Sequence, residues 1–284
     1  MSLETGRWSK AYLEITNRCN ASCRFCPGHS RPKRDLTEDE LRRVLSQLRD
    51  RVTYLYFHLM GEPLLHPEVI RFATVAKEEY GFRVMVTTNG ILSRRVGLPL
   101  VQSRAVFKIS LSLHAYEANS FPVLLRDYLD GCLALAEEAD RNGTVCALRL
   151  WNRGGDSTQN DEILRLLRER YPYPWRENRS GYALGRTVFL EWGDRFDWPN
   201  GREERHEARF CHALRSQIGI LSDGTVVPCC LDAEGAVPLG NLFTDSLDAV
   251  LSSPRAKALY DGFSAHTAVE PLCRTCGFTD RFLI

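Results

Sequence analysis

The sequence predicts an α/β fold in which helices cover a parallel sheet, open or barrel-like, and a small C-terminal domain follows. Three observations lead to this prediction. Strand-like and helix-like segments alternate within residues 12–192, which is typical of βα units with parallel strands. From Gly193 onward the sequence becomes polar and rich in turn residues. A chain of 284 residues, 44% hydrophobic and 26% charged, is long enough for one large and one small domain.

The predicted strands are short apolar runs rich in aromatic and β-branched residues, and the helices carry apolar residues at helical spacing. The six strands comprise residues 12–16, 53–60, 82–88, 106–113, 144–151 and 187–192. The helices comprise residues 37–49, 67–80, 93–102, 121–142 and 158–170. Thr37 and Glu40 form a capping-box pattern at the start of the first helix. Sheets of this kind bind ligands at the carboxyl ends of their strands, so we expect the site there.

The predicted domains are residues 1–192, a polar connector at 193–210, and a small domain at 211–284. Within the small domain, Asp-Gly at 223–224 between two apolar runs predicts a hairpin, and residues 247–260 should be a helix. About 80 residues are too few for a large core, but a bound metal can stabilise a domain of that size.

Composition and charge exclude several classes of function. The net charge is +1, with 37 Lys and Arg against 36 Asp and Glu, so nucleic acid is not the expected partner. No apolar run reaches the roughly 18 residues of a membrane span, and the N-terminus lacks the apolar core of a signal peptide. We therefore expect a cytoplasmic protein with no membrane partner. Disulfides are rare in that compartment, so ten cysteines, most of them grouped, indicate metal or redox chemistry.

Cys19, Cys23 and Cys26 form a C-x3-C-x2-C motif in the loop after the first predicted strand. A [4Fe–4S] cluster has four irons, so three thiolates would leave one iron free to bind another molecule. Structural zinc is the alternative. Zinc prefers four ligands, usually in C-x2-C pairs, and this triplet has no obvious fourth ligand nearby in the sequence.

A second group comprises Cys211, Cys229, Cys273 and Cys276. Two cysteines near the predicted hairpin and a terminal C-x2-C pair supply four ligands. That set is consistent with either a zinc ribbon or a [4Fe–4S] cluster, and four ligands would close the site to direct ligation by a substrate. Cys230 adjoins Cys229, and the residues alone leave open which of the two is the ligand.

These motifs resemble those of the radical S-adenosylmethionine (radical SAM) enzymes, over about residues 11–192. The signature of that superfamily is C-x3-C-x2-C after the first strand of a partial (β/α)6 barrel. Met60-Gly61-Glu62-Pro63, after the second strand, resembles the GGEP motif that holds the methionine amino group of the cofactor. His58 and His66 flank this motif, and each is either a hydrogen-bonded structural residue or part of the active site.

Further cofactor contacts are implied by the same resemblance. Asn89 lies in a Thr-Asn-Gly segment that resembles the TNG found after the third strand. Ser112 and His114 match the S-x-D segment near the cofactor ribose, with His114 in place of the usual Asp. Phe25 occupies the aromatic position that lies near the adenine, and Arg149 is a candidate on the fifth strand, where no GxIxGxxE-like motif is evident.

The resemblance implies a catalytic [4Fe–4S] cluster held by the three-cysteine motif, with its open iron binding S-adenosylmethionine. An electron from a reductant such as flavodoxin or ferredoxin would produce a 5′-deoxyadenosyl radical that abstracts a hydrogen atom from the substrate. Oxidation, epimerisation or crosslinking could follow. Neighbouring families act on peptides or on small polar natural products. Because the signature begins at residue 19, no leader-peptide recognition domain is expected, which weakens the peptide alternative.

The second cysteine group resembles the opening of a SPASM domain, including its G-x4-C element from Gly224 to Cys229, which favours Cys229 as a ligand. Only eight residues follow Cys276, so the resemblance implies one auxiliary [4Fe–4S] cluster, as in the shortened "twitch" form. Cys230 is then either a buried thiol or, as in radical epimerases, a hydrogen-atom donor. The alternative from another class is a non-enzymatic iron–sulfur or zinc protein that transfers electrons or acts as a scaffold.

Overall fold

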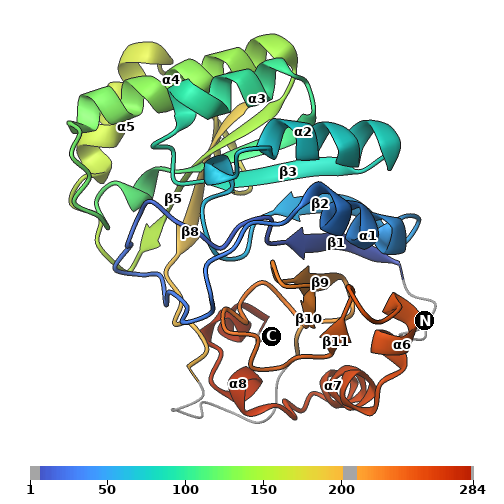
Figure 1. Cartoon of the computed structure of the whole chain (residues 1–284). Coiled ribbons are helices and arrows are strands. Elements are labelled where there is room, and N and C mark those ends of the chain that lie inside the picture. Colours follow the sequence, from blue (N-terminus) through green and yellow to red (C-terminus); the bar gives the residue numbers. More distant parts are fainter. Residues whose placement is uncertain (1–6, 201–209, 283–284) are drawn as a thin grey trace.

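The computed structural model describes residues 7–200 and 210–282, and its centre is one sheet of 11 strands (Figure 1). The strand order is β11-β10-β9-β1-β2-β3-β4-β5-β8-β7-β6. Six neighbouring strands are parallel and confirm the predicted βα units: β1 (Trp8–Leu13), β2 (Val52–Phe57), β3 (Arg83–Thr88), β4 (Val106–Ser112), β5 (Val145–Arg153) and β8 (Val188–Asp194). The sheet is not closed, because β11 and β6 form its edges. The fold is therefore the predicted α/β partial barrel.

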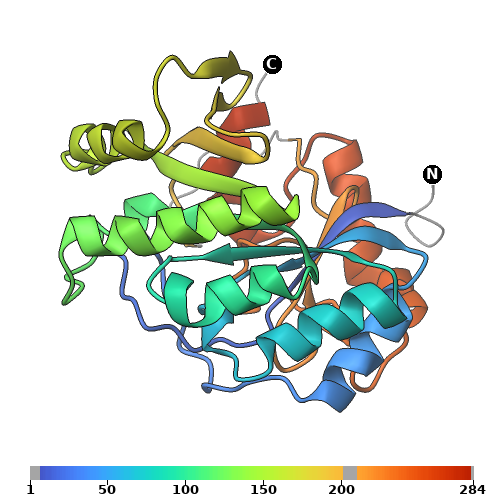
Figure 2. The ribbon, with the colours of Figure 1, turned by 90° about the horizontal axis from the view of Figure 1, so that it is seen from above.

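Helices connect the parallel strands, and α1 to α4 lie side by side along the sheet (Figures 1 and 2). The helices of this part are α1 (Glu38–Leu48), α2 (Val69–Thr74), α3 (Leu98–Gln102), α4 (Leu125–Asn142) and α5 (Asn160–Arg170). Short 3-10 or π turns comprise Pro63–Leu65, Val75–Glu79, Ser93–Gly97, Leu113–Ala115 and Gly277–Phe282. The predicted capping box is present, because Thr37 Oγ1 accepts the Glu40 N–H and the Glu40 carboxylate accepts the Thr37 N–H. Within the described ranges, every helix is too short or too polar to cross a membrane.

Several predicted boundaries are wrong. The predicted helix at 121–142 begins at Leu125, and the predicted strands at 12–16 and 53–60 end at Leu13 and Phe57. β1 begins at Trp8 rather than at residue 12, because the Trp8 side chain is buried and its indole N–H donates to the Leu214 carbonyl oxygen at 2.9 Å. The predicted helix at 247–260 is two helices, α6 (Leu247–Ser252) and α7 (Pro254–Ser264). It breaks there because a proline has no backbone N–H to continue the first helix, whereas it is well suited to begin the second.

The edge of the sheet beyond β8 is formed by residues 176–183, which none of the predicted strands includes. β6 (Arg176–Asn178) and β7 (Gly181–Ala183) form an antiparallel hairpin, and β7 pairs with β8. Gly181 permits this pairing, because a Cβ at that position would lie 2.1 Å from the Leu190 carbonyl oxygen. The short polar strands have no alternation of apolar residues that would have revealed them in the sequence.

The C-terminal segment continues the same sheet. The predicted hairpin is confirmed as β9 (Gln217–Ile220) and β10 (Thr225–Val227), and β11 (Gly240–Asn241) and α8 (Pro271–Arg274) follow. β9 pairs in parallel with β1, so the segment drawn in orange and red lies directly against the first strand (Figure 1). This pairing brings the C-terminal cysteines next to the ends of the parallel strands.

A buried ion pair ties the cysteine loop to both β1 and the C-terminal segment. The Arg31 guanidinium donates two hydrogen bonds to the Glu14 carboxylate, at 2.8 and 2.6 Å, and a third to the Ala233 carbonyl oxygen at 2.9 Å. The Ser222 hydroxyl donates to the same carboxylate at 2.8 Å. The Glu14 side chain is fully buried, so these groups hold three distant parts of the chain in one arrangement.

Candidate active site

A cavity of about 1090 Å³ lies where the parallel strands end and the C-terminal segment meets the sheet. All of the cysteines predicted as ligands line it, together with Cys230. Most other predicted site residues line it too: Phe25, Gly61, Glu62, Asn89, Ser112, His114 and Arg149. Pro63 is buried in the 3-10 turn behind the lining. The fold therefore brings together residues from five separate predicted motifs.

The loop that carries Cys19, Cys23 and Cys26 is held in shape by hydrogen bonds at its base. The Asn17 side chain spans the loop, donating to the Pro32 carbonyl oxygen and accepting the Arg34 N–H, both at 2.8 Å. The three thiols are free and face the cavity, as ligands of a shared cluster must.

No three His, Cys, Asp or Glu side chains within residues 7–200 and 210–282 converge on a position for one ion. A [4Fe–4S] cluster requires a wider arrangement, because each thiolate binds a different iron atom.

Gly61 and Glu62 pack directly against the base of the cysteine loop. Gly61 has a φ of +78°, and a Cβ there would lie 2.3 Å from the Thr16 carbonyl oxygen, so only glycine fits. The Glu62 carboxylate accepts the backbone N–H groups of Asn89 at 2.7 Å and Leu64 at 3.1 Å. Burial raises the pKa of Glu62 to about 7, although these hydrogen bonds act in the opposite direction.

The remaining predicted cofactor contacts lie on neighbouring strands. The Phe25 ring packs against His114 with 5.0 Å between ring centroids. Burial lowers the pKa of His114 to about 4, so its imidazole is neutral at pH 7. Arg149 donates from Nε to the Glu191 carboxylate at 3.1 Å, and its guanidinium lies over the Trp151 ring. Ser112 ends β4 beside them, at the cavity wall.

The two flanking histidines differ in their surroundings. His66 is buried, its Nε2 lies 2.9 Å from the Leu36 carbonyl oxygen, and its Nδ1 accepts the Glu68 N–H, which supports the structural alternative. His58 instead lines the cavity. Burial lowers the pKa of His58 to about 4, so it too is neutral at pH 7.

The second cysteine group comes from three segments: one before β9, one after β10, and one around α8. Cys211, Cys229, Cys273 and Cys276 all face the cavity, and burial raises the pKa of the Cys211 thiol to about 11. Cys230 lies at the same wall and packs against a small buried cluster that includes Tyr12, on β1. Both Cys229 and Cys230 line the cavity, so the geometry keeps both as candidate ligands.

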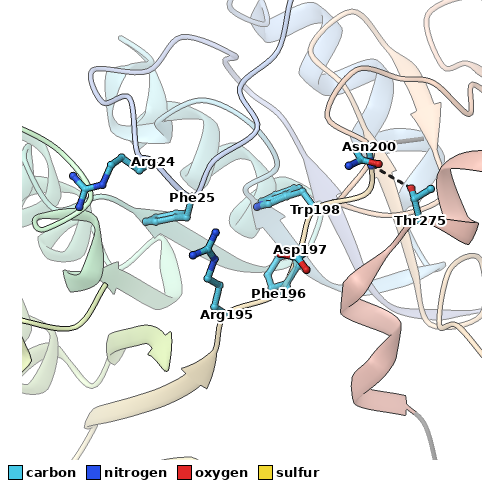
Figure 3. A pocket seen from close by; sticks show the side chains of 8 residues that line it. All are labelled: Arg24, Phe25, Arg195, Phe196, Asp197, Trp198, Asn200 and Thr275. Carbon is cyan, nitrogen blue, oxygen red and sulfur yellow. Dashed lines mark hydrogen bonds between the residues drawn. The ribbon is translucent and has the colours of Figure 1, made fainter. Parts of the chain in front are cut away.

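A smaller cavity of about 400 Å³ adjoins the main one. Four residues line both cavities: Phe25, Arg195, Phe196 and Trp198. Figure 3 shows the Arg24 and Arg195 guanidinium groups beside the Phe25 ring. Asp156 pairs with Arg24 at 2.7 Å, whereas Arg195 has no hydrogen bond or ion pair from its side chain to any residue that the structure describes. The sequence had suggested only a connector at 193–210, of which 201–209 lie outside the described residues.

Asn119 is a second residue that sequence reasoning missed. It follows the 3-10 turn after β4, and its side-chain amide donates to Cys23 Sγ at 3.0 Å. No spacing rule connects residues this far apart in the chain, and only the fold brings them into contact.

Comparisons with known proteins agree with this geometry. The profile of the radical SAM superfamily matches residues 13–174, and that of the SPASM iron–sulfur cluster-binding domain matches residues 211–277. The second match supports an iron–sulfur cluster rather than a zinc ribbon at the C-terminal cysteines. Among curated proteins, the Bacillus subtilis antilisterial bacteriocin subtilosin biosynthesis protein AlbA is 24% identical, over 94% of this chain and 66% of its own length.

Other relatives cover less of the chain. The GTP 3′,8-cyclase of Lactiplantibacillus plantarum is 31% identical over 40% of this chain and 36% of its own length. The chain spans less than two thirds of the length of the curated relatives it matches.

Solved structures share the fold at low identity. BtrN in complex with AdoMet and 2-DOIA aligns with a TM-score of 0.60 and 17% identity, over 97% of this chain and 94% of BtrN. Native anSMEcpe with bound AdoMet aligns with a TM-score of 0.64 and 13% identity, over 94% and 89%. The superfamily profile matches more than half of the chain, across the cysteine loop and most of the parallel strands, so this protein belongs to the radical SAM superfamily and carries a C-terminal SPASM domain.

Proposed function

We propose that this enzyme cleaves S-adenosylmethionine reductively and abstracts a hydrogen atom from a small polar molecule or a peptide. The observation that carries the proposal is that both cysteine groups line the same cavity as Met60, Gly61 and Glu62 of the MGEP motif. A substrate in that cavity would lie between the two cluster positions and within reach of the cofactor. The superfamily match favours an enzyme over the electron-carrier alternative.

When bound, the catalytic cluster and S-adenosylmethionine supply a one-electron bond cleavage and a radical able to take a hydrogen atom. The chain's own residues bind and orient them. We assign Cys19, Cys23 and Cys26 to the catalytic cluster. Glu62 would accept the ammonium group of the cofactor, because its carboxylate is fixed by two backbone N–H groups and has no positively charged side chain bonded to it in the described part of the chain.

The other predicted contacts would surround the rest of the cofactor. Phe25 and His114 offer adjacent ring faces, and the His114 imidazole is neutral at pH 7. Arg149 has N–H donors beyond the one that bonds to Glu191, and Ser112 has a hydroxyl at the same wall. These groups suit a cofactor with a flat base, a ribose and a carboxylate.

The auxiliary [4Fe–4S] cluster would be held by Cys211, Cys229, Cys273 and Cys276. Four thiolates leave no open iron, so we propose that this cluster exchanges electrons or stabilises the C-terminal segment and does not bind the substrate. A reductant such as flavodoxin or ferredoxin would supply the electron to the catalytic cluster.

The substrate would reach the main cavity through the smaller cavity, which is lined by aromatic rings and the Arg195 guanidinium (Figure 3). Such a mixture suits a polar or acidic group on a small molecule or a peptide side chain. Two similar proteins support these two substrate classes. AlbA is named for the biosynthesis of a bacteriocin, and BtrN is solved in complex with 2-DOIA. Oxidation, epimerisation and crosslinking all begin with the same hydrogen abstraction.

The role of Cys230 would determine whether oxidation, epimerisation or crosslinking follows the hydrogen abstraction. Its thiol lines the cavity in which we place the substrate, so it would be able to return a hydrogen atom to a substrate radical. Thiols exchange with solvent, so in D2O the wild type should place deuterium in the 5′-deoxyadenosine that it forms without substrate. Cys230→Ser should reduce this incorporation several-fold, while Cys132→Ser, in the core, should not. Equal incorporation in all three proteins would show that Cys230 does not supply a hydrogen atom to the 5′-deoxyadenosyl radical. With substrate present, a Cys230→Ala variant that still forms a normal epimerised product would rule out the donor role.

The proposed reaction is tested by incubating the reconstituted protein with dithionite and S-adenosylmethionine and measuring 5′-deoxyadenosine. The wild type and the Cys132→Ala control should form it, and Cys26→Ala should not, because two thiolates cannot hold the catalytic cluster. Equal product from Cys26→Ala and the wild type would refute the assignment of this loop.

A further inference from the structure

The Cys23 thiol of the cysteine loop receives a hydrogen bond from a side chain outside the loop. The donor is the Asn119 amide, whose Nδ2 lies 3.0 Å from Cys23 Sγ. A substitution of Asn119 can therefore remove this bond without changing the loop sequence.

The orientation of the Asn119 amide is fixed by its other partners. Its Oδ1 lies 2.7 Å from the Ser22 backbone N–H, which can only donate, so that atom must be the oxygen. Its Nδ2 then has one hydrogen for the Ala115 carbonyl oxygen, at 2.6 Å, and one for Cys23 Sγ. Turning the amide over would break three hydrogen bonds at once.

The turn that carries Asn119 is itself attached to the cysteine loop. The Arg24 backbone N–H donates to the Ala118 carbonyl oxygen at 3.1 Å, and Arg24 Nη2 donates to the Glu117 carbonyl oxygen at 2.9 Å. These bonds join the segment after β4 and its 3-10 turn to the middle of the loop. Several contacts therefore fix the position of the Asn119 amide relative to Cys23 Sγ.

We infer that Asn119 is a positioning residue that raises the reduction potential of the catalytic cluster through its hydrogen bond to Cys23. This inference rests on the proposed assignment of Cys23 to that cluster. An N–H dipole directed at a thiolate ligand stabilises negative charge, and reduction adds negative charge to the cluster. The donor therefore stabilises the reduced form more than the oxidised form.

The test is a redox titration of the reconstituted full-length protein, followed by electron paramagnetic resonance with and without S-adenosylmethionine, so that the signal perturbed by the cofactor identifies the catalytic cluster. Asn119→Ala removes the donor without adding charge. Asn119→Asp retains the acceptor for Ser22 and removes the donor. Both should shift the equilibrium about tenfold toward the oxidised cluster, or about 59 mV for one electron. Asn142→Ala, at the far end of α4, should not.

Several outcomes would overturn the inference. If Asn119→Ala and Asn119→Asp both have the reduction potential of the wild type, the hydrogen bond to Cys23 does not affect the potential of the cluster. A shift in Asn119→Asp alone would show that added charge, and not the lost donor, is responsible. If neither variant retains the catalytic cluster while the auxiliary one stays intact, Asn119 only holds the loop and the tuning inference is wrong. If the wild type itself has no signal that S-adenosylmethionine perturbs, the proposed function fails instead.

Discussion

Glu62 is a carboxylate with almost no solvent contact, 2% exposed, and its hydrogen-bond partners are backbone N–H groups that carry no charge. Burial is the largest influence on it and raises its pKa from 4.5 to about 7. The folded apoprotein therefore binds this proton more tightly than the unfolded chain does. The stabilising contribution is complete below pH 4.5 and is lost as the pH rises toward 7.

We predict that Glu62→Gln flattens the pH dependence of apoprotein stability between about pH 4.5 and 7, a total effect of roughly 3 kcal/mol. Urea unfolding at several pH values measures the free energy of unfolding of both proteins. Glu169→Gln, at an exposed position on α5, serves as the control and should leave the slope unchanged. A slope in Glu62→Gln equal to that of the wild type would show that Glu62 titrates normally.

Gly61 and Gly81 make a matched pair for testing the close approach to the cysteine loop. Their φ values are +78° and +77°, but an added Cβ meets the Thr16 carbonyl oxygen only at Gly61 and nothing within 4 Å at Gly81. Gly81→Ala should cost about 1–2 kcal/mol of stability and retain 5′-deoxyadenosine formation. Gly61→Ala should displace the loop and abolish product formation. Comparable activity in the two variants would contradict the predicted clash.

Residue by residue, the sequence predicts the part of the site that lies in local motifs. Cys19 to Cys26 and the MGEP segment are each readable because their spacing is itself the signal. Asn119 and Arg195 are not readable in this way, because an amide or a guanidinium acquires a role only through a partner that the fold supplies. Tyr12 is similar, since nothing in β1 indicates that its side chain lines the same cavity as Cys230.

At the scale of elements, the buried pair of Arg31 and Glu14 joins the cysteine loop, β1 and the C-terminal hairpin. Arg31→Met would leave the fully buried Glu14 carboxylate without its charged partner, which typically costs about 3–5 kcal/mol. The surface pair of Arg42 with Glu79 is the matched control, and Arg42→Met should cost about 1 kcal/mol or less. Urea unfolding of both variants measures the difference. Equal costs would show that the buried pair does not hold the three parts together.

Elements with a strong local signal were predicted well, and those that depend on tertiary contact were not. α1 was identified because Thr37 and Glu40 cap a regular apolar stripe. β6 and β7 were missed because each is three residues long and without an apolar face, and they exist only by pairing with β8. The split between α6 and α7 could have been predicted, since a proline at position 254 is plain in the sequence.

At the scale of the whole molecule, the C-terminal segment is joined to the barrel by β9 beside β1 and not merely by a connector. The sequence indicates two regions because it becomes polar and rich in turn residues at Gly193. Strand pairing between distant segments cannot be recognised from local composition. This pairing is what allows two cysteine groups, far apart in the chain, to share one cavity. We propose that the cavity is the place where both clusters and the substrate meet.

The most direct test of this account is to count iron and sulfide per chain in protein reconstituted without oxygen, and to measure 5′-deoxyadenosine from the same sample after adding dithionite and S-adenosylmethionine. We predict about eight irons per chain, four for each cluster, together with cofactor cleavage. About four irons with cleavage would show that the C-terminal cysteines hold no iron–sulfur cluster. Eight irons with no cleavage from a reduced first cluster would contradict the central claim that the cavity performs radical chemistry.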